Sequence, residues 1–269
     1  MPNATHLAPS SAAAPYAFGP PTSTNASNRF ELAVTPGLCV GPPKRQFMMG
    51  GVGLAAAIAA IETTTNRPLL WATCQYLSIA QPGQELEIEV DVLAAGKSVT
   101  QARAQIRSRG KEIISVSSAL GARKADDNTQ YTESPDVPTP AALGPEPSET
   151  KESNDLFTRI ERRRVNDPEA EAAGRARMWV RPLATEPMTA SLLAVFADFL
   201  PGAIPLTRRS SSLDNTIRIV SREETDWILI DSTIHVLADG FFHGEARLFS
   251  ESGGLLAIAS QSAGLPRRN

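Results

Sequence analysis

Cysteine and histidine are scarce in this sequence, whose 269 residues include only two Cys and three His. Cys39 and Cys74 stand in apolar surroundings, with no second Cys or His at the spacing of metal ligands. The sequence therefore predicts neither a disulfide framework nor a metal site. Net charge is also small, −3 from 26 Lys plus Arg against 29 Asp plus Glu. Because phosphate affinity comes from a surplus of cations, this balance argues against a nucleic-acid partner.

Long hydrophobic runs are missing as well. The longest apolar run, residues 48–61, is shorter than the ~20 residues that cross a bilayer and consists largely of Ala and Gly. We expect a buried helix there and no membrane span. No basic stretch precedes an apolar segment at the N-terminus, which argues against a secretory signal and makes the cytoplasm the expected location.

Proline marks how the chain is organised. Of 21 prolines, ten lie in residues 1–28 and 124–153, and both segments are poor in large apolar side chains. Such segments cannot offset their ordering entropy by burial. The sequence predicts a flexible arm over 1–28 and a linker over 124–153, which leaves two folded units, 29–123 and 154–269.

The two units share an internal match. Residues 96–119 align with residues 240–263 without a gap, and each stretch follows an apolar helix and two strand-like segments in the same order. The identical pairs include Gly96 and Gly240, Ala102 and Ala246, Arg103 and Arg247, and Ser118 and Ser262. This match predicts that the chain contains one architecture twice.

Periodicity and composition predict the elements of each unit. The segment 85–92 alternates strictly between apolar and polar residues, which is typical of a half-buried strand. We expect helices over 52–62 and 188–200, and further strands over 69–79, 211–219 and 227–237. Each unit is then one helix against an antiparallel sheet, an α+β arrangement.

Several stretches resemble the acyl-CoA thioesterase II family in order and spacing. On the C-terminal side they read SSSLDNTIRI, DWILIDSTIHVLADG and GGLLAIASQSAGL, and on the N-terminal side FMMGGVGLAAAIAA followed by QPGQELEIEV. The resemblance covers 29–123 and 154–269. It implies a double hotdog fold, with an N-terminal and a C-terminal hotdog domain in one chain.

The resemblance also implies a catalytic group of an Asp, a Ser or Thr, and a Gln that together activate a water. Asp214 matches the family Asp. Gln261 matches the Gln, although the register of the internal repeat would put Ser262 there, and a shift of one residue reverses the face of a strand. The hydroxyl position falls on His235, with Thr233 two residues earlier on the same face, so His235 replaces the hydroxyl or Thr233 supplies it.

The implied substrate is an acyl-CoA, with coenzyme A as part of the substrate and no other cofactor or metal. Backbone N–H groups of Gly50 and Gly51 at a helix start are expected to bind the developing oxyanion, since the first turn of a helix has unpaired N–H groups. Asp198 is a candidate carboxylate at the edge of the site. The resemblance further suggests a homo-oligomer.

Two other enzyme classes lack residues that they require. The pattern Gly51-x-Gly53-x-x-Ala56 fits a dinucleotide fingerprint, but no hydrophobic strand precedes it and no acid lies between Glu62 and Glu85. A hotdog hydratase would need a His about five residues after its Asp, where Ile219 stands. A non-catalytic acyl-thioester-binding hotdog protein with a degenerate site remains the alternative.

Overall fold

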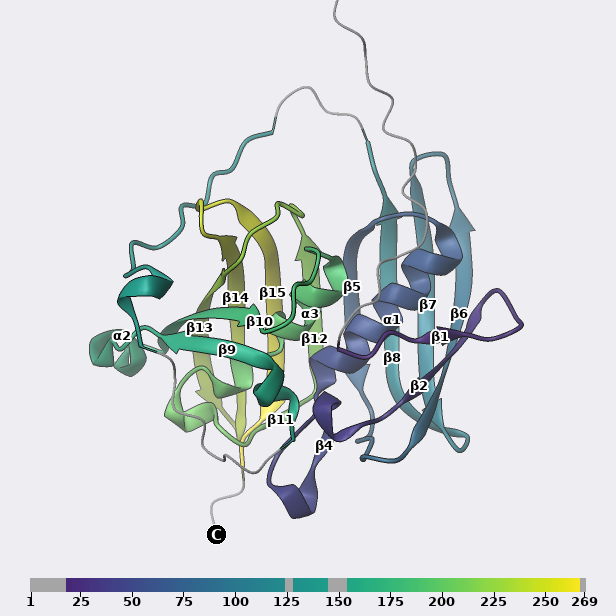
Figure 1. The fold of residues 1–269 in the computed structure, drawn as a ribbon, viewed down its shortest axis with the longest axis horizontal. Helices are drawn as coiled ribbons and strands as arrows, with labels where there is room; N and C mark the ends of the chain where they lie inside the picture. Colours follow the sequence, from purple (N-terminus) through teal and green to yellow (C-terminus); the bar gives the residue numbers. More distant parts are fainter. Residues whose placement is uncertain (1–17, 124–127, 145–153, 267–269) are drawn as a thin grey trace, which may run out of the picture.

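The computed structural model describes residues 18–123, 128–144 and 154–266, so the first 17 residues of the predicted arm lie outside the described residues. The chain forms two similar halves, each with a helix lying against antiparallel strands (Figure 1). In the described residues no helix is both long and apolar enough to cross a membrane.

The N-terminal half contains the long helix and the strands that surround it. Its elements are β1 (Thr22–Ser23), β2 (Arg29–Ala33), β3 (Cys39–Val40), β4 (Phe47–Met48), α1 (Gly50–Thr65), β5 (Leu69–Tyr76), β6 (Glu85–Ala95), β7 (Val99–Ser108) and β8 (Lys111–Gly121). Short 3-10 turns, η1 (Pro36–Leu38) and η2 (Pro43–Arg45), precede the helix.

The C-terminal half repeats this order after a stretch that contains η3 (Pro140–Ala142). Its elements are η4 (Leu156–Arg159), β9 (Ile160–Arg164), α2 (Pro168–Ala172), β10 (Arg175–Pro182), α3 (Ala190–Ala197), η5 (Leu200–Gly202), η6 (Pro205–Thr207), β11 (Ser211–Ser212), β12 (Asp214–Ile219), β13 (Ile228–Ala238), β14 (Phe241–Ser250) and β15 (Leu255–Gly264).

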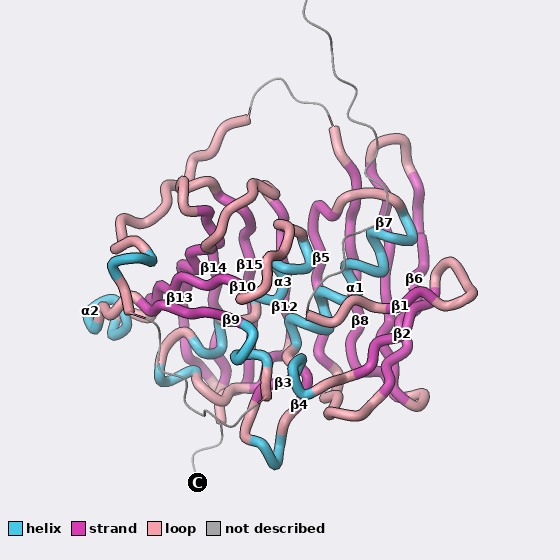
Figure 2. Tube along the Cα trace, viewed as in Figure 1, coloured by secondary structure: helices cyan, strands magenta, loops and turns pink. Residues whose placement is uncertain are grey.

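One large sheet joins the halves. Within the described residues it has 13 strands in the order β1-β2-β6-β7-β8-β5-β12-β15-β14-β13-β10-β9, with β11 paired to β15. The strands β5 and β12 meet at the seam, where the Thr73 and Thr216 hydroxyl oxygens lie 2.7 Å apart. Figure 2 shows α1 and α3 on one side of this sheet, near its middle, whereas α2 lies at one edge of the molecule.

Alternation explains how the strands form the core. In β6, Leu86, Ile88 and Val90 are almost fully buried, whereas the acidic residues between them face away from the core. Burying one such aliphatic side chain contributes about 1.5–3 kcal/mol. The helix α1 is enclosed on most of its surface, which suits its Ala-rich, apolar sequence.

The two central helices pack against each other in opposite directions. Near the start of α3, the Ser191 hydroxyl donates to the Ala55 carbonyl oxygen at 3.0 Å, and near its end the chain reaches Gly51. A methyl group at Gly51 would lie 2.9 Å from the Ala194 carbonyl oxygen and 3.0 Å from that of Val195. Glycine therefore permits the close approach of the start of α1 to the end of α3.

The ungapped match between the halves holds only in part. Ala102 and Ala246 both face the core, but Ser118 is buried whereas its match, Ser262, faces away. The cause is the turn before the last strand, since residues 109–110 separate β7 from β8 and residues 251–254 separate β14 from β15. The match is therefore out of register in the last strand of each half.

The described part of the predicted linker packs against the C-terminal half. Val137 and Leu143 contact a second hydrophobic cluster that includes Trp179 and Trp227, and the Trp179 Nε1–H donates to the Pro138 carbonyl oxygen at 3.0 Å. This stretch is therefore part of the folded structure, because its few apolar side chains cover the apolar surface of Trp179 and Trp227.

Candidate active site

A buried carboxylate lies where the two central helices meet. Asp198 follows the last residue of α3, and the residue is only 7% exposed. The Gly51 N–H, in the first turn of α1, donates to Asp198 Oδ2 at 2.7 Å. The start of a helix has N–H groups without intrahelical partners and a partial positive charge, which favours a carboxylate there. Because α1 belongs to the N-terminal half, that half holds a carboxylate from the C-terminal half.

Gln261 and Ser212 complete the cluster from the sheet. The Gln261 Nε2 group donates to Asp198 Oδ1 at 2.6 Å and to the Ser212 Oγ at 2.9 Å. Gln261 is 3% exposed and sits on the helix-facing side of β15, which places Ser262 on the opposite side. Ser212 comes from β11, the two-residue strand beside β15.

The environment of Asp198 suits a general base. Burial raises its pKa from the ordinary 3.8 to about 6, and hydrogen bonds from Gly51 and Gln261 offset part of that effect. The Asn215 amide also favours the ionised form, although its geometry falls short of a full hydrogen bond with any described residue. A carboxylate with this pKa is ionised at neutral pH and is a better base than an exposed one.

Unpaired polar atoms gather around the carboxylate. Among the described residues, five buried side-chain atoms have no hydrogen-bond partner, and four of them belong to Tyr76, Asn215 and Gln261. Such atoms usually cost about 1–3 kcal/mol each, and natural proteins retain them mainly where a ligand or reaction uses them. The cluster therefore has the character of a site that binds a polar group.

Asp214 lies on the other face of the sheet. In β12, Asn215 and Ile217 are buried on the side of the helices, so the alternation of the strand turns Asp214 outward. Its Oδ1 accepts the Ser262 N–H at 2.8 Å. The structure thus separates Asp214 from the cluster of Asp198, Gln261 and Ser212.

Thr233 and His235 are also outside this cluster. On β13, which is paired with β10 on one side and β14 on the other, Ser232 and Ile234 face the helices. Thr233 therefore points to the opposite face of the sheet. The His235 side chain is 54% exposed at a bulge, with Nε2 3.8 Å from the nearest Glu245 carboxylate oxygen. The hydroxyl that contacts Gln261 is instead that of Ser212, which our sequence analysis missed.

The predicted glycine pair divides between two roles. The Gly51 N–H is occupied by Asp198, so in this arrangement it orients the carboxylate. The Gly50 N–H has no hydrogen-bond partner within the described part of the chain. A methyl group at Gly50 would lie 2.7 Å from the Tyr76 ring, so only glycine fits beneath that ring.

The two cysteines are poor candidates for nucleophiles. Both are buried, and burial raises the pKa of Cys39 to about 11 and that of Cys74 to about 12. Such thiols are poor nucleophiles because the thiolate is the reactive form.

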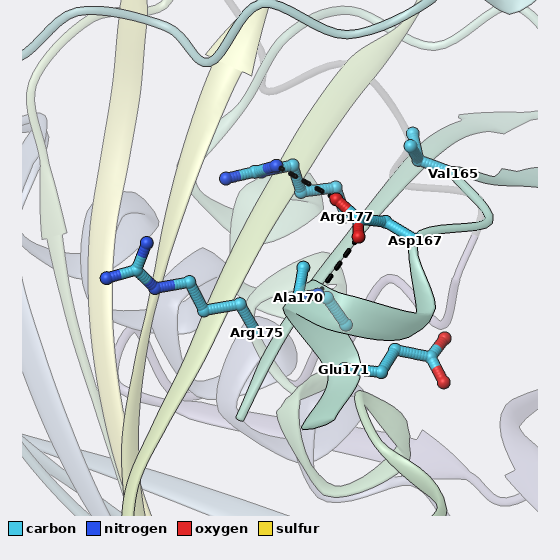
Figure 3. A pocket seen from close by; sticks show the side chains of 7 residues that line it. Val165, Asp167, Ala170, Glu171, Arg175 and Arg177 are labelled. Atoms are coloured by element: carbon cyan, nitrogen blue, oxygen red, sulfur yellow. Dashed lines mark hydrogen bonds and ion pairs between the residues drawn. The ribbon is translucent and has the colours of Figure 1, made fainter. Parts of the chain in front are cut away.

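A small hollow between α2 and β10 has a structural explanation. Figure 3 shows Asp167 between Ala170 and Arg177, and the Asp167 carboxylate accepts the Ala170 N–H at 2.9 Å. Arg177 also donates to Asp231 at 3.0 Å. These contacts cap α2 and fix β10, and we assign no chemistry to them.

Comparison with sequence models of protein families shows to which family the chain belongs. A sequence model of the acyl-CoA thioesterase N-terminal domain matches residues 42–121, and one of the C-terminal domain matches residues 133–265. The chain belongs to the acyl-CoA thioesterase family. Its enzyme class is therefore that of a thioester hydrolase, as the sequence predicts. Among curated protein sequences no match was found.

Solved structures agree with this membership. A proposed thioesterase from Novosphingobium aromaticivorans is 32% identical, and the alignment covers 94% of this chain and 100% of that one with a TM-score of 0.85. A hot dog protein from Alicyclobacillus acidocaldarius is 18% identical over 92% of this chain and 96% of its own, with a TM-score of 0.80. An acyl-CoA thioesterase II from Mycobacterium marinum is also 18% identical over 92% and 96%, with a TM-score of 0.74. The predicted double hotdog fold is confirmed.

Proposed function

We propose that this family member hydrolyses acyl-CoA thioesters to a free acid and coenzyme A, with Asp198 as the general base. The observation that carries the proposal is the pair of hydrogen bonds from the Gln261 amide to Asp198 and Ser212. It joins a carboxylate, an amide and a hydroxyl in one buried cluster. These are the residue types that the family resemblance implies, with Asp198 and Ser212 taking the places that we first assigned to Asp214 and to Thr233 or His235.

Hydrolysis of a thioester requires a base that accepts a proton from water and a carbonyl carbon that the water oxygen attacks. Asp198 takes a proton from water while the water oxygen attacks the thioester carbonyl carbon. The resulting tetrahedral intermediate breaks its carbon–sulfur bond, and the proton held by Asp198 passes to the departing sulfur. The products are the acid and the thiol of coenzyme A, so the reaction needs no metal and no cofactor beyond the substrate itself.

The surrounding groups position the reactants. Gln261 fixes Asp198 through Nε2, and its Oε1 atom, which has no partner among the described residues, is free to accept a hydrogen bond from the water. Ser212 places a second oxygen beside it. We assign the oxyanion to the Gly50 N–H, where loss of a donor typically costs on the order of 10²–10³ in rate.

The test compares two carboxylates on opposite faces of one sheet. Asp198→Asn should lower kcat for a series of acyl-CoA substrates by roughly 10²–10⁴, the range for loss of a general base. Asp214→Asn is the matched control and should retain most activity. Hydrolysis is measured with a thiol reagent that detects free coenzyme A, and circular dichroism checks that both variants fold.

The opposite ranking of the two variants would return the base to Asp214. If the wild-type protein binds acyl-CoA but hydrolyses none of the chain lengths tested, the chain is an acyl-thioester-binding protein and the catalytic proposal fails.

A further inference from the structure

Two adjacent arginines lie just before the cluster. Arg208 and Arg209 are exposed, and they precede Ser212 by four and three residues. Neither side chain forms an ion pair with any residue that the structure describes. At about 3.3–3.6 Å per residue, the Arg209 backbone is at most ~11 Å from that of Ser212.

The segment that carries these arginines is held in place. The Thr207 hydroxyl donates to the Ile204 carbonyl oxygen at 3.1 Å, and the Ser210 hydroxyl donates to the Thr207 carbonyl oxygen at 2.6 Å. Arg209 has a φ of +65°, an uncommon conformation for a residue with a side chain. A fixed backbone loses less entropy when its side chains bind a ligand.

A second basic pair lies shortly before α1, the helix whose first turn contacts the cluster. Lys44 and Arg45 are exposed on η2, six and five residues before Gly50, and they too have no ion pair among the described residues. The ranges 32–61 and 199–213 contain no acidic residue. Figure 1 shows β4 and β11, which adjoin these two pairs, at the same end of the sheet. The two segments that lead into the cluster thus carry only positive charges, although the whole chain is slightly acidic.

We propose that Arg208 and Arg209 bind the phosphate groups of the coenzyme A part of the substrate, with Lys44 and Arg45 as the opposite side of the same anion site. The inference rests on the proposed function. The acyl thioester is the end of the substrate that must reach the buried carboxylate, and the flexible pantetheine arm leaves the phosphates at the surface. Guanidinium groups match phosphate oxygens in charge and geometry.

The experiment removes charge from the protein and from the substrate in turn. The double variant Arg208→Gln/Arg209→Gln should raise KM for acyl-CoA roughly tenfold, which is within the range for two exposed charge contacts, and leave kcat within about twofold. With the same acyl group on pantetheine, which has no phosphate, KM should not change. Acyl-4′-phosphopantetheine, which lacks the nucleotide, distinguishes a site for the nucleotide phosphates from one for the single phosphate that a carrier protein would also present.

The control removes two cations elsewhere. Arg109 is exposed at a φ of +50° in the turn between β7 and β8, and Lys111 is exposed beside it. The variant Arg109→Gln/Lys111→Gln should leave all KM values unchanged, whereas Arg208→Lys/Arg209→Lys should restore most of the affinity for acyl-CoA. The rise in KM should shrink in high salt, because exposed charges are screened.

The proposal fails if both double Gln variants raise KM equally, or if the effect of Arg208 and Arg209 is the same for acyl-CoA and acyl-pantetheine. Direct titration of coenzyme A into the Asp198→Asn protein separates this failure from that of the proposed function. Binding that weakens about tenfold on removing Arg208 and Arg209 supports the anion site even without turnover, and unchanged binding refutes it.

Discussion

Replacing Asp198 with Asn should stabilise the folded protein at neutral pH while it removes activity. Burial raises the pKa of this carboxyl from 3.8 to about 6, against the hydrogen bonds of Gly51 and Gln261. One pKa unit corresponds to about 1.4 kcal/mol, so the ionised side chain costs the folded state about 3 kcal/mol relative to its protonated form. Asn keeps the size of the side chain and carries no charge.

The sign of the pH dependence follows from which state holds the proton. Between about pH 4 and pH 6 the folded protein keeps the proton on Asp198 whereas the unfolded chain releases it. The contribution of this group to stability therefore falls as the pH rises through that window and is constant above it. The gain from Asp198→Asn should be about 1 kcal/mol at pH 4.5 and about 3 kcal/mol at pH 7.5.

Urea unfolding followed by circular dichroism at these two pH values measures the difference. Comparing wild type with the variant at each pH cancels the contributions of all other carboxylates. An equal difference in the free energy of unfolding at both values would refute the reasoning, because it would mean that the pKa of Asp198 does not change on folding. In the wild type, kcat/KM should fall about tenfold per pH unit below pH 6, as the base becomes protonated.

Two further predictions concern packing. Gly51→Ala should lower the free energy of unfolding by about 1–3 kcal/mol, because the new methyl group would lie 2.7 Å from the Asp198 Cβ. Gly202→Ala is the control and should change stability little, since there is open space around Gly202. Urea unfolding of both variants tests this, and equal effects would contradict it. Trp179→Phe should lower the free energy of unfolding by about 1 kcal/mol, because the hydrogen bond to the Pro138 carbonyl oxygen is lost. Residues 128–144 should then be cleaved faster by protease, and an unchanged cleavage rate would contradict the packing of that stretch.

Local sequence was sufficient for the two central helices and for most of the strands that follow them, but it did not predict β9 or β10. The expected helix over 52–62 lies inside α1, and the alternating segment 85–92 lies inside β6, which continues to Ala95. Apolar spacing along the chain records which face of a helix or strand is buried, and this information depends only on near neighbours. The family resemblance supplied the double hotdog fold for the same reason, since it rests on contiguous stretches.

The site depended on contacts that the sequence does not display. Gly51 is 147 residues from Asp198, and Gln261 is 63 residues from it. Only the packing of α1 against α3, above the paired strands β11 and β15, brings these groups within hydrogen-bond distance. A signal for Ser212 was present in the serine run before Leu213, but nothing local indicated that a two-residue strand would direct its hydroxyl toward Gln261.

The two candidate carboxylates, Asp198 and Asp214, show which features the sequence determined and which ones depended on the tertiary structure. By itself the sequence determined that Asp198 lies in the predicted helix 188–200 and Asp214 in the predicted strand 211–219, and the family resemblance implied a catalytic carboxylate. The tertiary structure decided that Asp198 is buried at a helix junction and Asp214 faces outward. The physical reason is that desolvation, which raises the pKa of Asp198 to about 6, is a property of the assembled surroundings from both halves of the chain and of no single segment.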